Sequence, residues 1–471
     1  MADAESNIND SLLLPVDRVE KEIWRDLPDG SYTEELKRII FFAAPMAAVV
    51  IAQFTLQIIS MVMVGHLGNL ALASASLASS FCNVTGFSFI IGLSTALDTL
   101  SGQAYGAKLY RKLGLDIHSS YLSYTSLFLS IIWFNMEKLL VFLGQDHSIA
   151  HEAGRYAAWL IPGLFSYAVL QPLTRYFQNQ SMIRPLLITS SFVFCLHVPL
   201  CWLLVYKSGL GFLGGALAMG LSNWLYAILL GSIMFSSACS ETRAPLSMEI
   251  FNGVGEFFRY ALPSAAMVCL EWWSYELMIL LSGLLPNPEL ETSVLSVCLQ
   301  TISTIYSIPL AIAAAASTRI SNELGAGNYR AAHIVVYAAT SFAVMESVVV
   351  SLCLLLGRNV FGYVFSSDKA TVDYVAKLAP LVSITIILDS LQGFSQVLFL
   401  YYKYRFIVNI CIARGCGWQH IGAYINLGSF YLWGIPFAAT LAFWVNLKGV
   451  GLWVGIQTGS FCRPRKRMAL A

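Results

Sequence analysis

The sequence predicts an all-α membrane protein that crosses the bilayer many times. Hydrophobic residues make up 57% of the 471 residues, charged residues make up only 12%, and the mean hydropathy is +0.66. Water-soluble domains carry about 25% charged residues, so the composition excludes an ordinary soluble globule. Apolar windows of about 20 residues, the length that crosses the hydrocarbon core as a helix, recur along the whole chain. The net charge of +1 gives no support to nucleic-acid binding.

The apolar windows fall into two sets of six. A polar cytoplasmic tail at 1–35 has no signal-peptide pattern, so the first span is expected to insert as an internal signal. A cytoplasmic linker at 239–256 is expected to separate an N-lobe at 36–238 from a C-lobe at 257–461, and a basic tail follows at 462–471. The predicted spans are 38–64, 71–97, 118–136, 154–176, 185–206, 212–238, 257–284, 292–316, 332–356, 374–400, 418–442 and 447–461.

The placement of lysine and arginine predicts the orientation. With the N-terminus in the cytoplasm, 21 of the 28 basic residues fall on the cytoplasmic side and seven on the other. Basic residues flanking membrane helices are retained on the cytoplasmic side, so both termini are expected there.

An internal repeat links the two halves. Phe42–Pro45 matches Tyr260–Pro263 at an offset of 218 residues, and Ser101–Arg111 matches Ser321–Arg330 with one gap. Each half has an even number of spans, so the halves have the same orientation. Two bundles related by a pseudo-two-fold axis along the membrane normal are an architecture of transporters.

Two acidic residues lie inside apolar runs. Glu271 is in span seven, and Asp389 is in span ten. A carboxylate at the centre of a membrane helix costs roughly 2.5–3.5 kcal/mol on insertion scales, so such residues are functional-site candidates. We interpret both as proton-coupling groups that load a proton on one side and release it on the other. The alternative is that both are structural acids, hydrogen-bonded to neighbouring helices.

Polar and aromatic residues near these acids are candidate cavity residues. Tyr275, Gln300 and Tyr306 are placed to hydrogen-bond the acids. Trp272, Trp273 and Tyr306 are candidate walls for a flat or cationic substrate. Aromatic residues in membrane helices also serve as packing or interface anchors, which is the other interpretation of all three.

The cytoplasmic loops contain three further candidates. Asp98, at the end of span two, is expected to organise the loop that follows, and Gln103 and Glu323 occupy matching positions of the repeat as candidate gating residues. No metal site is predicted, because His147 and His151 have no third ligand nearby. The chain has no Walker motif, GxSxG or HExxH, so it is not predicted to be an enzyme and needs no cofactor beyond a proton gradient.

Several stretches resemble the multidrug and toxic compound extrusion (MATE) family, in particular its plant detoxification branch. They are ALDTLSGQAYGAK (Ala96–Lys108), CLEWWSYE (Cys269–Glu276), SGLLPNPELETSVLSVCL (Ser282–Leu299), STRISNELGAGN (Ser317–Asn328), LDSLQG (Leu388–Gly393) and ARGCGWQHIGAYINLG (Ala413–Gly428). The resemblance covers the chain from about residue 35 to 460.

The resemblance implies a twelve-helix antiporter with two lobes around a central cavity. Such a protein expels organic cations, alkaloids, flavonoids or similar compounds in exchange for protons, and Glu271 and Asp389 match the acids of that branch. Bacterial relatives carry an aspartate on the first helix where this chain has only Gln53 as a mid-span polar group, so proton coupling is expected in the C-lobe. The expected partners are a small organic substrate, protons and the lipid bilayer. The chain is expected to act as a monomer in the vacuolar or plasma membrane.

Two departures from the family pattern stand out. Residues 394–412 intervene between LDSLQG and ARGCGWQ, and we interpret them as an insertion foreign to the family. The twelfth span, 447–461, is short and gives way to Cys462–Arg467, so it looks truncated. Both departures are interpreted as gene-model or splicing artefacts, and this chain is expected to transport poorly.

Three other functions are alternatives to the antiporter. A flippase for lipids or lipid-linked sugars, the main alternative, favours a wide basic cavity for phosphates, whereas mid-span arginines are scarce here. A membrane-embedded enzyme needs a buried histidine or aspartate cluster, which His197 alone does not supply. A channel is disfavoured by the doubled bundle, which points to alternating access.

Overall fold

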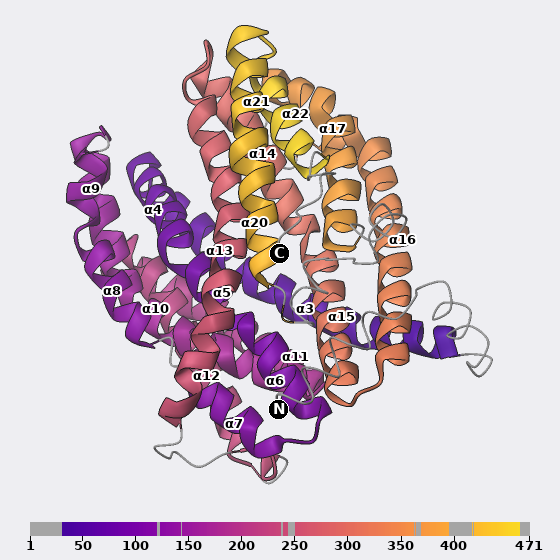
Figure 1. Ribbon diagram of the computed structural model, residues 1–471. Helices are drawn as coiled ribbons and strands as arrows, with labels where there is room; N and C mark the ends of the chain where they lie inside the picture. The colour runs from indigo at the N-terminus through magenta and orange to yellow at the C-terminus, as the bar shows by residue number, and fades with distance from the viewer. Residues whose placement is uncertain are drawn as a thin grey trace.

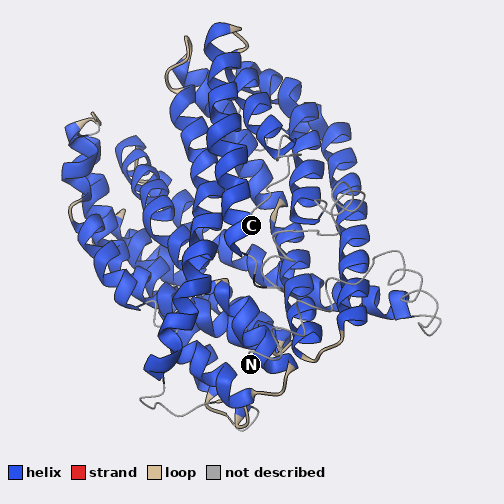
Figure 2. Ribbon diagram, viewed as in Figure 1, coloured by secondary structure: helices blue, strands red, loops and turns tan. Residues whose placement is uncertain are grey.

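The computed structural model describes residues 31–119, 123–142, 144–236, 239–243, 250–361, 363, 369–394, 417 and 419–461. Secondary structure within these residues is helical and includes no strand (Figure 2). The predictions for the first 30 residues, for residues 395–416 and for the basic tail lie outside the described residues. The all-α prediction is confirmed.

The first half of the chain forms one group of helices, which we call the N-lobe. Several of its helices follow one another within a single span, joined by one-turn π-helices (η). Its elements are α3 (Ser31–Gly65), α4 (Asn69–Cys82), η1 (Asn83–Phe87), α5 (Ser88–Ser94), α6 (Ala96–Gly106), α7 (Tyr110–Ser119), α8 (Ser123–Phe134), α9 (Met136–Phe142), α10 (His147–Asn179), α11 (Ile183–Trp202), η2 (Leu203–Lys207) and α12 (Leu213–Met234).

The second half forms the C-lobe. Its elements are α13 (Ile250–Ser282), α14 (Pro288–Ile305), α15 (Ser307–Gly325), α16 (Tyr329–Phe361), α17 (Lys369–Phe394), α20 (Gln419–Asn426), η5 (Leu427–Gly434), α21 (Ile435–Ala439), η6 (Thr440–Trp444) and α22 (Lys448–Phe461). Within the described residues, each span expected from the sequence overlaps one or more of the helices of these two lobes.

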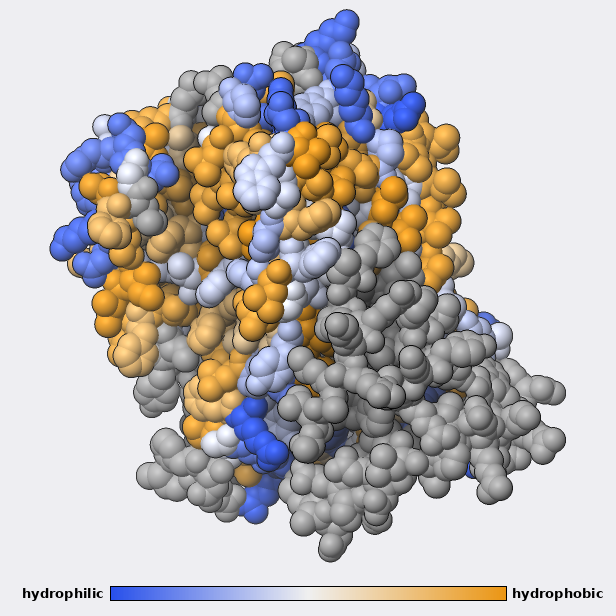
Figure 3. Space-filling model, turned by 45° about the horizontal axis from the view of Figure 1, so that its top comes forward, coloured by the Kyte–Doolittle hydropathy of each residue, from blue (hydrophilic) through white to orange (hydrophobic). Residues whose placement is uncertain are grey.

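Eight stretches of the described helices are long and apolar enough to cross a membrane. They are Tyr32–Gly65, Leu70–Gly106, Ile183–Lys207, Leu213–Met234, Gly253–Ser282, Leu290–Gly325, Arg330–Val360 and Gln419–Trp444. The space-filling view shows apolar side chains over much of the visible face, while hydrophilic ones gather near its upper and lower ends (Figure 3). A hydrophobic belt between polar ends is the surface that a lipid bilayer requires.

Irregular turns inside the second span are supported by side chains. In η1, Gly86 lies directly under the Trp133 ring, leaving no room for a β-carbon. The Trp133 indole N–H donates to the Thr85 hydroxyl at 3.0 Å, and that hydroxyl in turn donates to the Phe81 carbonyl at 2.7 Å. Such bonds satisfy polar groups of an irregular turn that lipid cannot satisfy.

The two lobes pack through equivalent pairs of helices. On one side α3 packs against α15, and on the other side α13 packs against α5. Under the 218-residue offset α3 corresponds to α13, and the span of α4–α6 corresponds to that of α14–α15. Helices α6 and α15 also contact each other. These contacts are what a pseudo-two-fold axis between the lobes produces.

The lobes meet at one end of the molecule, which we call the basic end. It carries the α6–α7 turn with Lys108 and Arg111 and the α15–α16 turn that leads to Arg330. In Figure 1 this end lies at the bottom, with α6, α7 and α12, while α4 and α9 rise on one side and α14 and α21 on the other.

Candidate functional site

A cavity of about 290 Å³ lies between the lobes. The N-lobe contributes most of its wall, and several of the lining groups are amides: Gln53, Gln57, Asn83, Gln171, Gln178 and Asn223. The C-lobe contributes Glu271, Trp272 and Tyr306. A largely apolar hollow with a few convergent polar groups is the usual form of a small-molecule site.

Helix α13 presents Glu271 to this cavity. Val268, Glu271 and Trp272 all line the cavity, and their spacing of three and four residues places them on one face of the helix. Tyr306, at the junction of α14 and α15, lines the same hollow. A carboxylate and two aromatic side chains therefore share the C-lobe wall.

The next two candidates on α13 do not line the cavity. Trp273 turns away, and its indole N–H donates to the Val84 carbonyl of η1 at 2.8 Å. Tyr275 lies near the ring of Phe430, with centroids 6.4 Å apart. Trp272 lines the cavity, whereas Trp273, one position further round the helix, lies on the side of α13 that faces η1.

A second carboxylate on α13 has a separate environment. Glu276 accepts a hydrogen bond from the Ser80 hydroxyl of α4 at 3.0 Å, so it connects the lobes rather than lining the cavity. Five helix positions correspond to a rotation of about 140°, so Glu276 and Glu271 face different neighbours.

Two sequence-predicted residues have side chains outside the described set. Asp389 is on α17 and Gln300 is on α14. Helix α14 contacts both α13 and α17, so the helices that carry Glu271 and Asp389 share a neighbour. The proximity of the two carboxylates stays a prediction.

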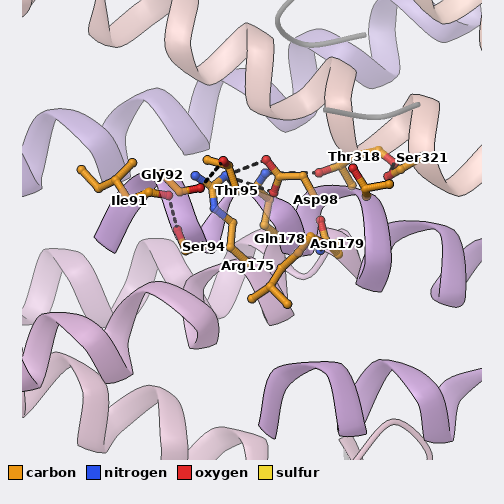
Figure 4. Close-up of polar contacts among 12 residues, drawn as sticks. Ile91, Gly92, Ser94, Thr95, Asp98, Arg175, Gln178, Asn179, Thr318 and Ser321 are labelled. Carbon is orange, nitrogen blue, oxygen red and sulfur yellow. Dashed lines mark hydrogen bonds and ion pairs between the residues drawn. The ribbon is translucent and has the colours of Figure 1, made fainter. Parts of the chain in front are cut away.

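Asp98 lies at the floor of the cavity, in the first turn of α6, which continues to Gly106. Its side chain is 1% exposed, and Arg175 of α10 places Nη1 3.3 Å and 3.4 Å from its two carboxylate oxygens (Figure 4). Both residues line the cavity. A buried carboxylate is costly unless it is paired, so Arg175 is the reason that Asp98 is tolerated at this depth.

Arg175 was not singled out from the sequence. The available signal was an arginine at the end of the apolar window 154–176, and it was counted only as a topology marker. Its Nη1 also donates to the Gln178 side-chain oxygen at 3.2 Å. Gln178 donates to the Thr318 hydroxyl of α15 at 3.3 Å, which carries the network from the N-lobe to the C-lobe.

Gln103 and Glu323 lie where the lobes meet. Gly325 approaches the Gln103 backbone so closely that a β-carbon would collide with the Gln103 carbonyl oxygen. Glu323 accepts a bond from Arg319 at 2.7 Å and one from the Asn328 amide at 3.2 Å. Arg319 also donates to Glu35 of α3 at 2.7 Å, an ion pair across the lobes.

A cavity between two equivalent lobes of membrane-spanning helices is the architecture of a transporter. The MatE family model matches the chain twice, at residues 45–203 and 263–440, so the two matches start at the equivalent Pro45 and Pro263. This chain belongs to the MATE family. It is therefore an integral membrane transporter and not an enzyme, and the family resemblance of the sequence is confirmed.

Similar proteins cover nearly the whole chain. Protein DETOXIFICATION 12 of Arabidopsis thaliana is 77% identical over 463 residues, which are 98% of this chain and 93% of that protein. The crystal structure of the eukaryotic MATE transporter AtDTX14 superposes with a TM-score of 0.85 at 50% identity and covers 91% of this chain and 94% of that one. A MOP superfamily transporter from Pyrococcus furiosus has a TM-score of 0.79 at 17% identity, covers 90% of this chain and 92% of that one, and shares the fold.

Proposed function

We propose that this transporter exports small aromatic or cationic organic compounds, such as alkaloids and flavonoids, in exchange for protons. The observation that carries the proposal is the position of Glu271, a carboxylate in mid-span that lines the cavity beside Trp272 and Tyr306. Ionised Glu271 attracts a cation, and the aromatic faces stabilise it further. Protonated Glu271 carries no charge and no longer attracts the cation. The proton and the cation therefore compete for one site.

The orientation follows from the basic end. We propose that this end faces the cytoplasm, because basic residues flanking membrane helices are retained there. The packed state of α6 and α15 then closes the cytoplasmic side, and the cavity serves the opposite face. In this state Glu271 takes up a proton from an acidic lumen or exterior, which releases the cargo. The lobes then rock, and the proton leaves to the cytoplasm.

Asp389 is proposed as the second acid of the C-lobe, and Gln300 and Tyr275 as groups that support the pair. The N-lobe contributes a wall of amides and one charged pair, so it is proposed to bind cargo rather than protons. Loading and release require proton and cargo to favour opposite states of the transporter.

A flippase for lipid-linked phosphates is the alternative. Such a cavity needs cationic groups free to bind phosphate. Among the described lining residues Arg175 is the basic one, and Asp98 already neutralises it. This charge balance favours the organic-compound exporter.

The test is transport into sealed vesicles under an imposed pH gradient, with the fluorescent cation ethidium as cargo. Glu271→Gln is expected to lose most pH-driven transport while remaining folded. Glu276→Gln is the matched control, because it makes the same change five residues along the same helix, away from the cavity. Equal loss in both variants, or no loss in Glu271→Gln, would contradict the proposal.

A further inference from the structure

A continuous chain of polar contacts runs from the cavity floor into the opposite lobe. It starts at Asp98, passes through Arg175 and Gln178, and ends at Thr318 on α15 (Figure 4). Gln178 and Thr318 are both 0% exposed. The first three members line the cavity, whereas the bond from Gln178 to Thr318 lies between the lobes.

The direction of the Gln178 amide is set by Arg175. A guanidinium carries only donors, so the side-chain oxygen of Gln178 must face it, and the amide NH₂ group is then directed at the Thr318 hydroxyl. Without Arg175 in this position, nothing in the chain of contacts selects this orientation of the amide.

The Gln178–Thr318 bond belongs to a wider contact between the lobes. The Asn322 amide donates to the Asn179 carbonyl at 3.1 Å, and the Gln419 amide donates to the Thr99 hydroxyl at 2.6 Å. Each of these bonds joins a residue of the N-lobe to one of the C-lobe. We call these three bonds, together with the packing of α6 on α15, the seal.

Arg175 is shared between the cavity and the seal. The same atom, Nη1, contacts Asp98 and Gln178. A cationic cargo can draw Asp98 toward the cavity, and a hydrogen-bond acceptor on the cargo can bind Arg175. Either event takes the Arg175 Nη1 atom away from Gln178. A buried amide that loses its hydrogen-bond partner is costly in free energy. The orientation of the Gln178 amide therefore depends on whether Arg175 is paired with Asp98.

We propose that Asp98 and Arg175 are positioning residues that transmit the contents of the cavity to the seal through Gln178. With the pair intact and the cavity empty, Gln178 holds Thr318 and the lobes stay together at the basic end. Cargo that perturbs the pair releases this bond and favours separation. Loss of one such bond shifts the ratio of sealed to separated molecules by roughly two- to tenfold. The inference needs a transporter with two moving lobes but not proton coupling through Glu271.

The experiment measures the distance between the lobes at the basic end by pulsed electron resonance. Spin labels are attached through Ala107→Cys and Ala326→Cys, two exposed positions that correspond in the repeat. The exposed Cys195 and Cys353 are replaced first, together with Cys411, Cys416 and Cys462.

Gln178→Met and Thr318→Val each remove the inter-lobe bond at nearly constant volume. Each is expected to increase the separated fraction two- to tenfold, and the double variant is expected to shift it no further than either single one. Gln180→Met is the matched control, because Gln180 caps α10 and its amide donates to the Tyr176 backbone carbonyl of that helix, within the N-lobe. A shift by Gln180→Met as large as that by Gln178→Met, or additive effects of Gln178→Met and Thr318→Val, would overturn the proposal.

Asp98→Asn tests the connection to the cavity. In the parent protein, saturating ethidium is expected to increase the separated fraction. In Asp98→Asn, Gln178→Met and Thr318→Val, the separated fraction is expected to be high without ethidium and to respond little to it. Ethidium is expected to bind to Thr318→Val still, because Thr318 is not among the described residues that line the cavity. A merely structural residue would lower stability and leave the response to ethidium intact. A full response to ethidium in folded Asp98→Asn or Gln178→Met would overturn the proposal.

Discussion

Gly106 of α6 packs directly against the backbone carbonyl of Asn322 on α15, with no room for a β-carbon between them. Gly325 of α15 makes the equivalent approach to the backbone of Gln103 on α6. The repeat matches these two segments in the sequence, and the structure brings them face to face. Small residues let helix backbones approach closely inside a membrane, so this crossing closes the basic end.

Gly106→Ala is predicted to favour the separated state. Overpacking of a tight contact costs about 1–3 kcal/mol, and this cost applies only while the lobes are together. The measurement is the distance between labels at positions 107 and 326. Gly231→Ala is the control, because a β-carbon at that helical glycine meets nothing within 4 Å. Equal distance distributions for both variants would show that the glycine contact is unimportant.

Glu35→Gln is predicted to weaken the same closure from its edge. The Glu35 carboxylate accepts from Arg319 at 2.7 Å, and both side chains are less than one-fifth exposed. Loss of a hydrogen bond between charged groups costs about 1.5–3 kcal/mol. The rate at which an impermeant maleimide, supplied at the basic end, labels Ser317→Cys is therefore expected to rise. Glu34→Gln, a change at an exposed neighbour, is expected to leave this rate unchanged. A similar rise in both variants would contradict a role of the Glu35–Arg319 ion pair in closing this end.

The buried Asp116 of α7 is expected to make the stability of the folded protein depend on pH. Burial raises the pKa of Asp116 to about 7, the nearby Lys112 ammonium lowers it in part, and Glu256 raises it. Because the folded pKa lies above the unfolded value, the folded state loses stability as the pH rises through 7. The loss between pH 6 and pH 8 is about 1 kcal/mol.

Asp116→Asn removes this titration. The variant is expected to be more stable than the parent at pH 8 and to differ from it less at pH 6, as measured by thermal unfolding in detergent. Glu256 and Lys112 themselves form an ion pair at 3.1 Å between α7 and α13, and they remain in the variant. A difference between the two proteins that is constant across this range would refute the prediction.

Much of the fold could be predicted from the sequence because spans depend on local composition. Windows of apolar residues located the helices, and the Pro45–Pro263 correspondence located the repeat. The direction of each side chain depends on packing instead. Trp272 and Trp273 are neighbours in sequence, yet only Trp272 lines the cavity, because the position of a helix face relative to its neighbours is a tertiary property.

The pairing of Asp98 with Arg175 could not be predicted for the same reason. The residues are 77 positions apart, and no local pattern connects them. From the sequence, Asp98 was expected at the end of span two, beside the loop that follows, whereas α6 continues to Gly106 and keeps Asp98 inside the protein. The mid-span carboxylate Glu271 was easier to find, since a charged residue in an apolar window is visible without knowledge of its neighbours.

The central claim is that Glu271 exchanges protons for cargo, and the most direct measurement is proton movement driven by cargo alone. Proteoliposomes with a trapped pH dye and no initial pH gradient receive an outward gradient of ethidium. In the parent protein, ethidium efflux is predicted to drive protons inward and acidify the lumen. Glu271→Gln is predicted to abolish this acidification, whereas Glu276→Gln retains it. Acidification by Glu271→Gln at the parent rate would contradict the account.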